Sequence, residues 1–230
     1  RMQKRRKIMK TQSITIIVAV VILLGASETW ATSIAFYEDG VIEEGNVYSW
    51  VSVHNDATVD MSGGMVTSQL TAYDFSTGNV SGGILEAIIS TDTSTVNLSG
   101  AMQIVGLGVS SSGTVTMFGG SVVLMEVGSS NPVNLHGGVI SDYLKAVSTV
   151  NIYGYGFEYD PLAGDHRGGQ LTGFWVDDTP FSIDLYYLKA PGGPFIDTWS
   201  HITLIPEPAT ILLLGLGAIN IRISRFRKGE

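Results

Sequence analysis

The sequence contains no cysteine and few charged residues, and both features limit what the protein can be. Without cysteine there are no disulfides, thiolate metal sites or cysteine nucleophiles. Charged residues make up 15% of the 230 residues, well below the roughly 25% of an ordinary soluble domain. The 28 glycines follow no G-x-y period, which excludes collagen. Few charges together with many Gly, Ser, Thr, Val and Ile favour short strands and tight turns over long helices.

Basic residues are nearly absent from the middle of the chain. Between residues 32 and 205 the only ones are Lys145, Arg167 and Lys189, and with 18 acidic residues they give this stretch a net charge of −15. Such an acidic body would repel phosphate backbones, which proteins bind through clustered Lys and Arg. Nucleic acid is therefore not an expected partner.

The N-terminal segment has the layout of a secretory signal. Several basic residues over 4–10 precede an apolar run over 14–24, which is shorter than the roughly 20 residues of a membrane-spanning helix. Small residues, Thr29 and Ala31, occupy the −3 and −1 positions of a cleavage after Ala31. We expect a signal peptide over 1–31 whose apolar run is helical. An uncleaved anchor is the alternative.

Near the C-terminus a short proline-containing motif, an apolar run over 211–221 and a basic tail follow one another. The prolines remove backbone donors and favour an extended segment that an enzyme can reach. The motif comprises Pro206, Glu207, Pro208, Ala209 and Thr210, and the basic tail contains Arg222, Arg225, Arg227 and Lys228.

This order of features resembles the PEP-CTERM sorting signal and covers residues 205–230. The resemblance implies an exosortase, a membrane-embedded enzyme that recognises the tag and cuts near Pro-Glu-Pro. It also implies a short transmembrane helix whose basic tail stays in the cytoplasm, as the positive-inside rule requires. The expected partners are exosortase, the secretion machinery and the membrane. The alternative is an ordinary tail anchor.

A phrase of the form Val-x-Leu/Met/Ile followed by glycine recurs between the two ends. Its nearly constant spacing is too short for helical-pair or propeller-blade repeats. The alternation places two apolar side chains on one face, and the glycines supply a sharp corner. The first glycines of the copies are Gly63, Gly82, Gly100, Gly119, Gly137 and Gly154.

This period, near 18, fits one coil of a β-solenoid with three faces of about six residues each. We predict an all-β fold, a right-handed parallel β-helix over 32–160, in which stacked coils bury their apolar residues on one another. A fainter first copy begins at Val41, one period before Val59. A sandwich of unrelated hairpins would not explain glycines in register over six copies.

The register fades after Tyr155, and the Gly- and Pro-containing stretch 156–169 is interpreted as a loop. Three short strands are expected over 171–176, 181–188 and 199–205. We predict that 161–204 forms a short β cap, because the open end of a solenoid must be protected. Residues 35–50 are expected to cover the other end.

The body offers little catalytic chemistry. Lys145 is the only Lys or Arg within the repeats, and the carboxylates at Asp60, Glu86, Glu126 and Asp142 do not share one repeat position. Glycosidases need such carboxylates close together. We therefore predict no catalytic, metal or cofactor site. The four histidines lack any metal-ligand spacing, and they are His54, His136, His166 and His201.

The predicted function is that of an exported structural or adhesive protein of the cell surface or extracellular matrix. Exopolysaccharide or other biofilm matrix is the partner that the resemblance implies. The alternative is a secreted β-helix polysaccharide lyase or glycoside hydrolase. Outward Thr, Ser and Asn could form ladders that bind glycans or ice. The position after the repeat Val varies, however, so the sequence predicts no clean Thr array and ice binding is the lesser option.

Overall fold

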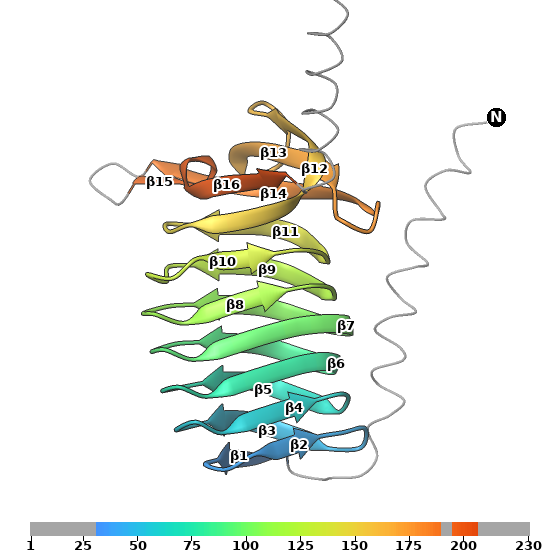
Figure 1. Cartoon of the computed structure of the whole chain (residues 1–230), viewed down its shortest axis with the longest axis vertical. Helices are drawn as coiled ribbons and strands as arrows, with labels where there is room; N and C mark the ends of the chain where they lie inside the picture. Colours follow the sequence, from blue (N-terminus) through green and yellow to red (C-terminus); the bar gives the residue numbers. More distant parts are fainter. Residues whose placement is uncertain (1–30, 190–194, 207–230) are drawn as a thin grey trace, which may run out of the picture. The chain divides into compact units, whose positions relative to one another are not determined.

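The computed structural model describes residues 31–189 and 195–206, and its regular elements are β-strands apart from one short 3-10 helix (Figure 1). Within these residues, sixteen strands form one hydrogen-bonded sheet. The strands up to the sixth complete coil are β1 (Thr32–Phe36), β2 (Gly40–Ile42), β3 (Val47–Val53), β4 (Thr58–Met61), β5 (Met65–Ala72), β6 (Thr77–Ser90), β7 (Thr95–Val109), β8 (Thr114–Met117), β9 (Ser121–Val127), β10 (Val133–Leu135) and β11 (Val139–Ala146). The remaining elements are β12 (Val150–Asp160), β13 (Arg167–Phe174), β14 (Pro180–Lys189), β15 (Phe195–Asp197), the helix η1 (Thr198–His201) and β16 (Ile202–Pro206).

The strands wind into a β-solenoid of about six turns, which confirms the predicted all-β solenoid. Each coil has a short strand such as β4 and a longer strand such as β5. Equivalent strands of successive coils pair in parallel: β4 pairs with β6, and β5 pairs with the second part of β6. β6 and β7 are each long enough to include both the short-strand and the longer-strand segment of their coil. The right-handed sense of the coil stays a prediction.

Each coil contains two strands of unequal length, and the number of faces stays a prediction. The longer strand changes register near its middle: between β5 and β6 the shift falls between Val66 and Gln69. Two residues of β5 there oppose a single residue, Glu86, of β6. Such a bulge bends a strand without ending it. It also explains why copies of slightly different length can stack in register.

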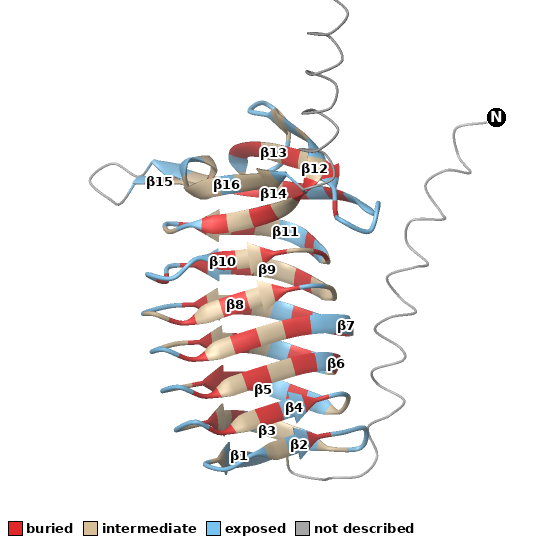
Figure 2. Cartoon of the chain, viewed as in Figure 1, coloured by how far each residue is buried: buried red, intermediate tan, exposed pale blue. Residues whose placement is uncertain are grey.

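Side-chain alternation along the strands builds the core. In β4, Val59 and Met61 are buried while Asp60 is exposed, and the other short strands repeat this pattern (Figure 2). Each fully buried aliphatic side chain contributes roughly 1.5–3 kcal/mol to folding relative to an exposed one. The largest fully buried side chains are Ile42, Met61, Leu70, Leu85, Ile88, Leu98, Ile104, Leu107, Met117, Met125, Leu135 and Leu144.

Glycine pairs follow several of the short-strand segments, and the two glycines of a pair are required for different reasons. A Cβ on Gly137 would lie 2.4 Å from the carbonyl oxygen of Phe118 in the preceding coil, so the first glycine permits close stacking. Gly138 has a φ of +94°, a conformation that disfavours side chains. The repeated glycines therefore mark the corners where one coil rests on the next.

We expect Gly137→Ala to lower the free energy of unfolding by more than about 2 kcal/mol, because backbone atoms of two coils would have to separate. Gly78→Ala is the matched control. A Cβ on Gly78 would meet only side-chain atoms 3.8 Å away, and its φ is ordinary. That substitution should be neutral or stabilising by about 0.4–1 kcal/mol. Chemical denaturation of both variants measures the difference, and equal losses would contradict this account of the corner.

The C-terminal segment extends the stacking. β16 pairs in parallel with β12, Val150 facing Ile202, although three other strands and η1 lie between them in the sequence. β14 pairs with β11 through Leu144 and Leu185. β12, β13, β14 and β15 pair with one another as antiparallel neighbours. Thus two strands of the predicted cap segment continue the coils, and the others form an antiparallel extension.

Two local expectations for this segment were wrong. The stretch 156–169 is mostly strand, because β12 continues to Asp160 and β13 begins at Arg167. Gly156 and Gly169 have positive φ within these strands and do not end them. The strand expected over 199–205 begins only at Ile202, after η1.

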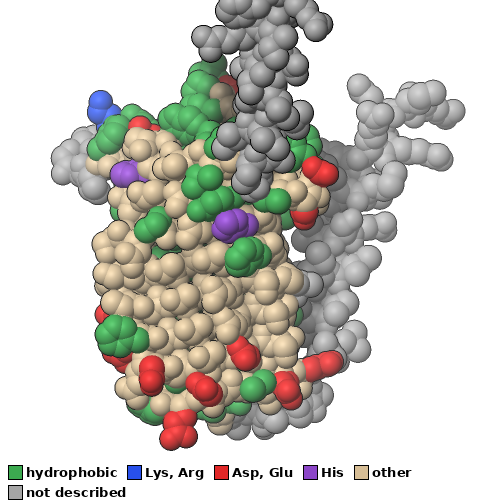
Figure 3. All heavy atoms as spheres, in the orientation of Figure 1, with side chains coloured by type: hydrophobic (Ala, Val, Ile, Leu, Met, Phe, Trp, Pro, Cys, Tyr) green, Lys and Arg blue, Asp and Glu red, His purple; other side chains and the backbone are tan. Residues whose placement is uncertain are grey.

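The N-terminal end is a coil rather than a separate cover. Gly40 faces Val59, so the first copy is real but begins slightly earlier than its resemblance at Val41 suggested. Among the described residues β2 pairs only with β4, which leaves its outer edge without a partner strand. Charged side chains discourage strand addition at such an edge. Figure 3 shows acidic side chains around this end, and the exposed ones on the first coil are Glu38, Asp39, Glu43 and Glu44.

Candidate functional sites

The last solenoid strand leads directly into the proline motif. β16 follows β12 residue by residue until Pro206 faces Gly154. Proline has no backbone N–H to continue a ladder, so the pairing ends naturally there. Pro206 is exposed. A processing enzyme acting at this motif would therefore work next to the final coil.

Most other predicted processing residues lie outside the described residues. This holds for Glu207, Pro208, Ala209 and Thr210, for the basic tail at Arg222, Arg225, Arg227 and Lys228, and for both predicted terminal helices. Ala31 is described and directly precedes β1. Within the described residues, no helix has the length and hydropathy that crossing a membrane would require.

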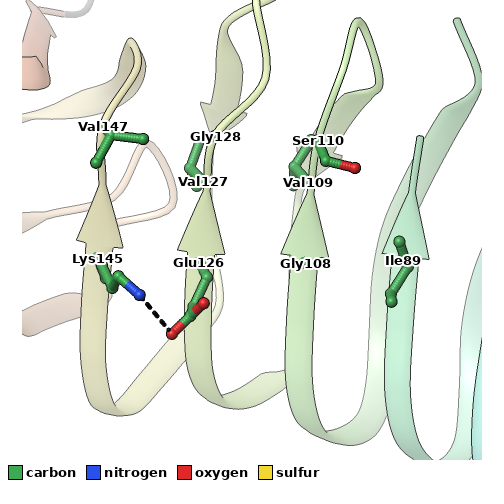
Figure 4. A pocket seen from close by; sticks show the side chains of 9 residues that line it. All are labelled: Ile89, Gly108, Val109, Ser110, Glu126, Val127, Gly128, Lys145 and Val147. Atoms are coloured by element: carbon green, nitrogen blue, oxygen red, sulfur yellow. Dashed lines mark hydrogen bonds and ion pairs between the residues drawn. The ribbon is translucent and has the colours of Figure 1, made fainter. Parts of the chain in front are cut away.

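A depression of about 300 Å³ lies on the outer face of the longer strands (Figure 4). Gly108 of β7 lies between Ile89 of β6 and Glu126 of β9, so the middle position of this row has no side chain. Gly106 produces a second gap beside it. The depression forms because Gly106 and Gly108 leave this part of β7 without outward side chains, and its lining extends from β6 to β11.

An ion pair closes one side of this depression. Lys145 Nζ lies 3.0 Å from Glu126 Oε1, and the Tyr143 hydroxyl lies 3.5 Å from the same oxygen. The Lys145 ammonium also lies 5.9 Å from the ring centre of Tyr186. His166 Nε2 lies 2.8 Å from Asp142 Oδ1, and its ring contacts Tyr143. Charged and aromatic groups from β9, β11, β14 and the turn before β13 thus meet at the C-terminal end of this face.

Sequence reasoning did not find this cluster. In the sequence, Lys145 is recognisable only as an isolated base. The available signal was that Glu126 and Lys145 are one repeat period apart, which makes them neighbours on adjacent coils. Glu86 lies opposite the bulge of β5 and Asp142 lies in the bulge of β11, with β7 and β9 between β6 and β11. The Glu126–Lys145 ion pair thus lies beside the depression. Surface ion pairs of this kind contribute less than about 1 kcal/mol to stability.

Burial raises the pKa of the Tyr143 phenol, and the Glu126 carboxylate raises it further, while Lys145 opposes this effect. Folding therefore favours the protonated phenol. The contribution of Tyr143 to stability is complete below the pKa of the unfolded chain and is lost as pH rises through the pKa of the folded protein.

We expect Glu126→Gln to lower the pKa of Tyr143. Ultraviolet phenolate titration, corrected with the same variant carrying Tyr143→Phe, measures it. Glu44→Gln, a remote control, should leave this pKa unchanged, and an unchanged pKa in Glu126→Gln would contradict the assignment.

His54 and Asp177 each make contacts within the local structure. His54 stacks between Tyr37 and Tyr73 on neighbouring coils. The Asp177 carboxylate accepts hydrogen bonds from the backbone N–H and the hydroxyl of Thr179, which lowers the pKa of Asp177. Within the part of the chain that the structure describes, no three His, Asp or Glu residues form a group that could hold a metal ion.

The fold and its final strand define a β-solenoid whose last coil runs into a C-terminal targeting segment. Residues 204–228 match the family model for the PEP-CTERM protein-sorting motif. The chain carries a PEP-CTERM sorting motif at its C-terminus, and the motif implies export, exosortase processing and sorting to the cell surface. The matched segment begins inside β16 and contains all the predicted motif and tail residues. No curated protein and no solved structure matches the chain.

Proposed function

We propose that the protein is a non-enzymatic structural or adhesive component of the cell surface or extracellular matrix, released or attached after exosortase processing. The observation that carries this proposal is the continuity between the stacked coils and the sorting motif at Pro206. Such an arrangement presents a rigid repetitive body as soon as the tag has been processed. The signal peptide over 1–31, with cleavage after Ala31, is part of the proposal.

Cell fractionation tests the sorting step. In a host that contains the matching exosortase, the unaltered chain should reach the surface or medium with a reduced mass. Glu207→Ala should leave an unprocessed form in the membrane fraction, because it alters the centre of the motif. Glu44→Ala, an exposed acidic residue on the first coil, is the matched control. Identical location and mass for Glu207→Ala and the unaltered chain would contradict exosortase processing.

A polysaccharide lyase or hydrolase is the second candidate, and the observation that favours it is Lys145 beside Glu126 at the outer-face depression. The two candidates differ in product formation. Incubation with neutral and acidic polysaccharides should release no new reducing ends or unsaturated sugars if the protein is a scaffold. Release that Lys145→Ala abolishes would support the enzyme.

A further inference from the structure

The short strands present three outward columns of side chains. The first is a run of threonines in strict register, since Thr58 faces Thr77, Thr77 faces Thr95, and Thr95 faces Thr114. Three of these threonines precede the repeat Val and Thr77 precedes Gly78, so none of them occupies the position after Val. The second column, further along each strand, contains Asp60, Asn79, Asn97, Thr116, Asn134, Asn151 and Thr203.

The second column is ordered by hydrogen bonds between coils. Asn79 Nδ2 donates to Asp60 Oδ1 at 2.8 Å, and Asn97 Nδ2 donates to Asn79 Oδ1 at 2.9 Å. Asn151 Nδ2 donates to Asn134 Oδ1 at 2.9 Å in the same way. Asn79 uses one donor and one acceptor in the ladder, and Asn97 and Asn151 each use one donor, so these amides retain further hydrogen-bonding capacity for a ligand. Because the ladder already holds the side chains, binding would cost them little rotamer entropy.

The third column changes character halfway along the solenoid. It begins with serines such as Ser99, and from the residue after β8 as far as Tyr153 it is aromatic. The rings of Phe118 and His136 stack with centres 5.0 Å apart, and those of His136 and Tyr153 stack at 3.9 Å. The Phe118 side chain is 58% exposed. Leu98 faces Met117, so the position below Phe118 is Ser99, too small to cover the other face of the ring.

The face formed by the three columns carries almost no charge, unlike the rest of the body. Asp60 is the only Asp, Glu, Lys or Arg in the three columns from residue 58 to residue 153. Figure 3 shows the same face, on which β4, β8 and β10 lie in Figure 1, as an uncharged polar surface between acidic side chains and a group of hydrophobic and histidine side chains. Neutral ligands can approach such a surface, whereas an acidic polymer would be repelled by the body's net charge of −15.

We propose that this face binds an uncharged polysaccharide, with one sugar ring stacked on the open face of Phe118 and its neighbours hydrogen-bonded to the Thr and Asn columns. Hydroxyl and amide groups recur once per coil, about every 4.8 Å, and suit a polymer that displays hydroxyl groups regularly. An exposed aromatic ring beside such groups favours a sugar, which has apolar C–H faces, over an ice surface. The inference deepens the proposed function, because it names the matrix partner.

Retention on insoluble neutral polysaccharides, such as cellulose, chitin and β-glucan, tests the proposal with the full-length chain purified in detergent. We expect retention on at least one of them, weakened about tenfold by Phe118→Ala. Asn97→Asp should weaken it too, because it places a charge in the ladder. Phe75→Ala is the matched control, since Phe75 is 74% exposed on a turn outside the three columns. Acidic polysaccharides should not retain the chain.

Three results would overturn the proposal: no retention on any neutral polysaccharide, equal retention of Phe118→Ala and Phe75→Ala, or shaping of ice crystals without polysaccharide retention. Circular dichroism of each variant separates loss of binding from loss of fold. Fractionation of Glu207→Ala reports independently on sorting. A chain that is correctly sorted but not retained would therefore refute the ligand and leave the sorting account standing.

Discussion

Deletion of residues 95–113, which is one whole coil, should leave a folded and cooperatively unfolding solenoid. Thr95 faces Thr114 and Ile104 faces Val122, so the deletion joins equivalent positions. Solenoid stability is approximately a sum over repeats and their interfaces, and losing one coil should lower it without abolishing the fold. Circular dichroism during thermal unfolding measures the outcome.

Deletion of residues 95–104 is the matched comparison and should destroy the cooperative transition. It would place Leu107 at an outward position of the short strand and Gly108 at an inward one. A shift of this kind exchanges the buried and exposed faces of a strand. If this half-coil deletion and the whole-coil deletion unfolded alike, coil-by-coil stacking would be the wrong description.

Leu98→Asp should prevent stable folding, with a loss of more than about 4 kcal/mol, because it places a carboxylate in an apolar interior without a partner. Leu98 is fully buried between neighbouring coils. Asn97→Asp is the control at the adjacent residue, whose side chain points outward, and it should cost less than about 1 kcal/mol. Denaturant unfolding of the two variants gives the comparison. Similar losses would mean that the inward and outward assignments of the short strand are wrong.

The repeat could be predicted because the same physical demand recurs in every coil. The inward pair, such as Val96 and Leu98, must be apolar, and the corner must admit close backbone approach, so both leave a pattern in the sequence. The Thr column is equally visible in the sequence but was not predicted, because it lies outside the position after Val. The bulges could not be predicted from the sequence, because bulge residues such as Thr67 and Ser68 of β5 have no distinctive residue type.

The C-terminal end could not be predicted in the same way. β16 joins the stack only after the intervening antiparallel strands, and Ile202, Thr203 and Leu204 are not followed by a glycine pair. The coil alignment there depends on those antiparallel strands, which have no repeat signal. The Glu126–Lys145 pair, by contrast, required only the observation that residues one period apart become neighbours.

The sorting motif was accessible from sequence because its chemistry is linear. Proline, an apolar run and a basic tail act in chain order and need no tertiary contact to be recognised. The structure adds one point that sequence could not supply, namely that Pro206 ends a strand of the final coil. The motif therefore begins where the packed body ends, with no described spacer between them.

Disulfide trapping tests most directly whether consecutive copies lie above one another. The chain has no cysteine, so Asn79→Cys with Asn97→Cys introduces a single pair on adjacent coils. Paired strands lie about 4.8 Å apart, within reach of a disulfide, whereas Asn79→Cys with Thr116→Cys spans two coils and exceeds the limit of about 7 Å. Mild oxidation should cross-link the first pair within the chain and leave the second pair reduced. Failure of the first pair, or equal cross-linking of both, would contradict the stacked solenoid.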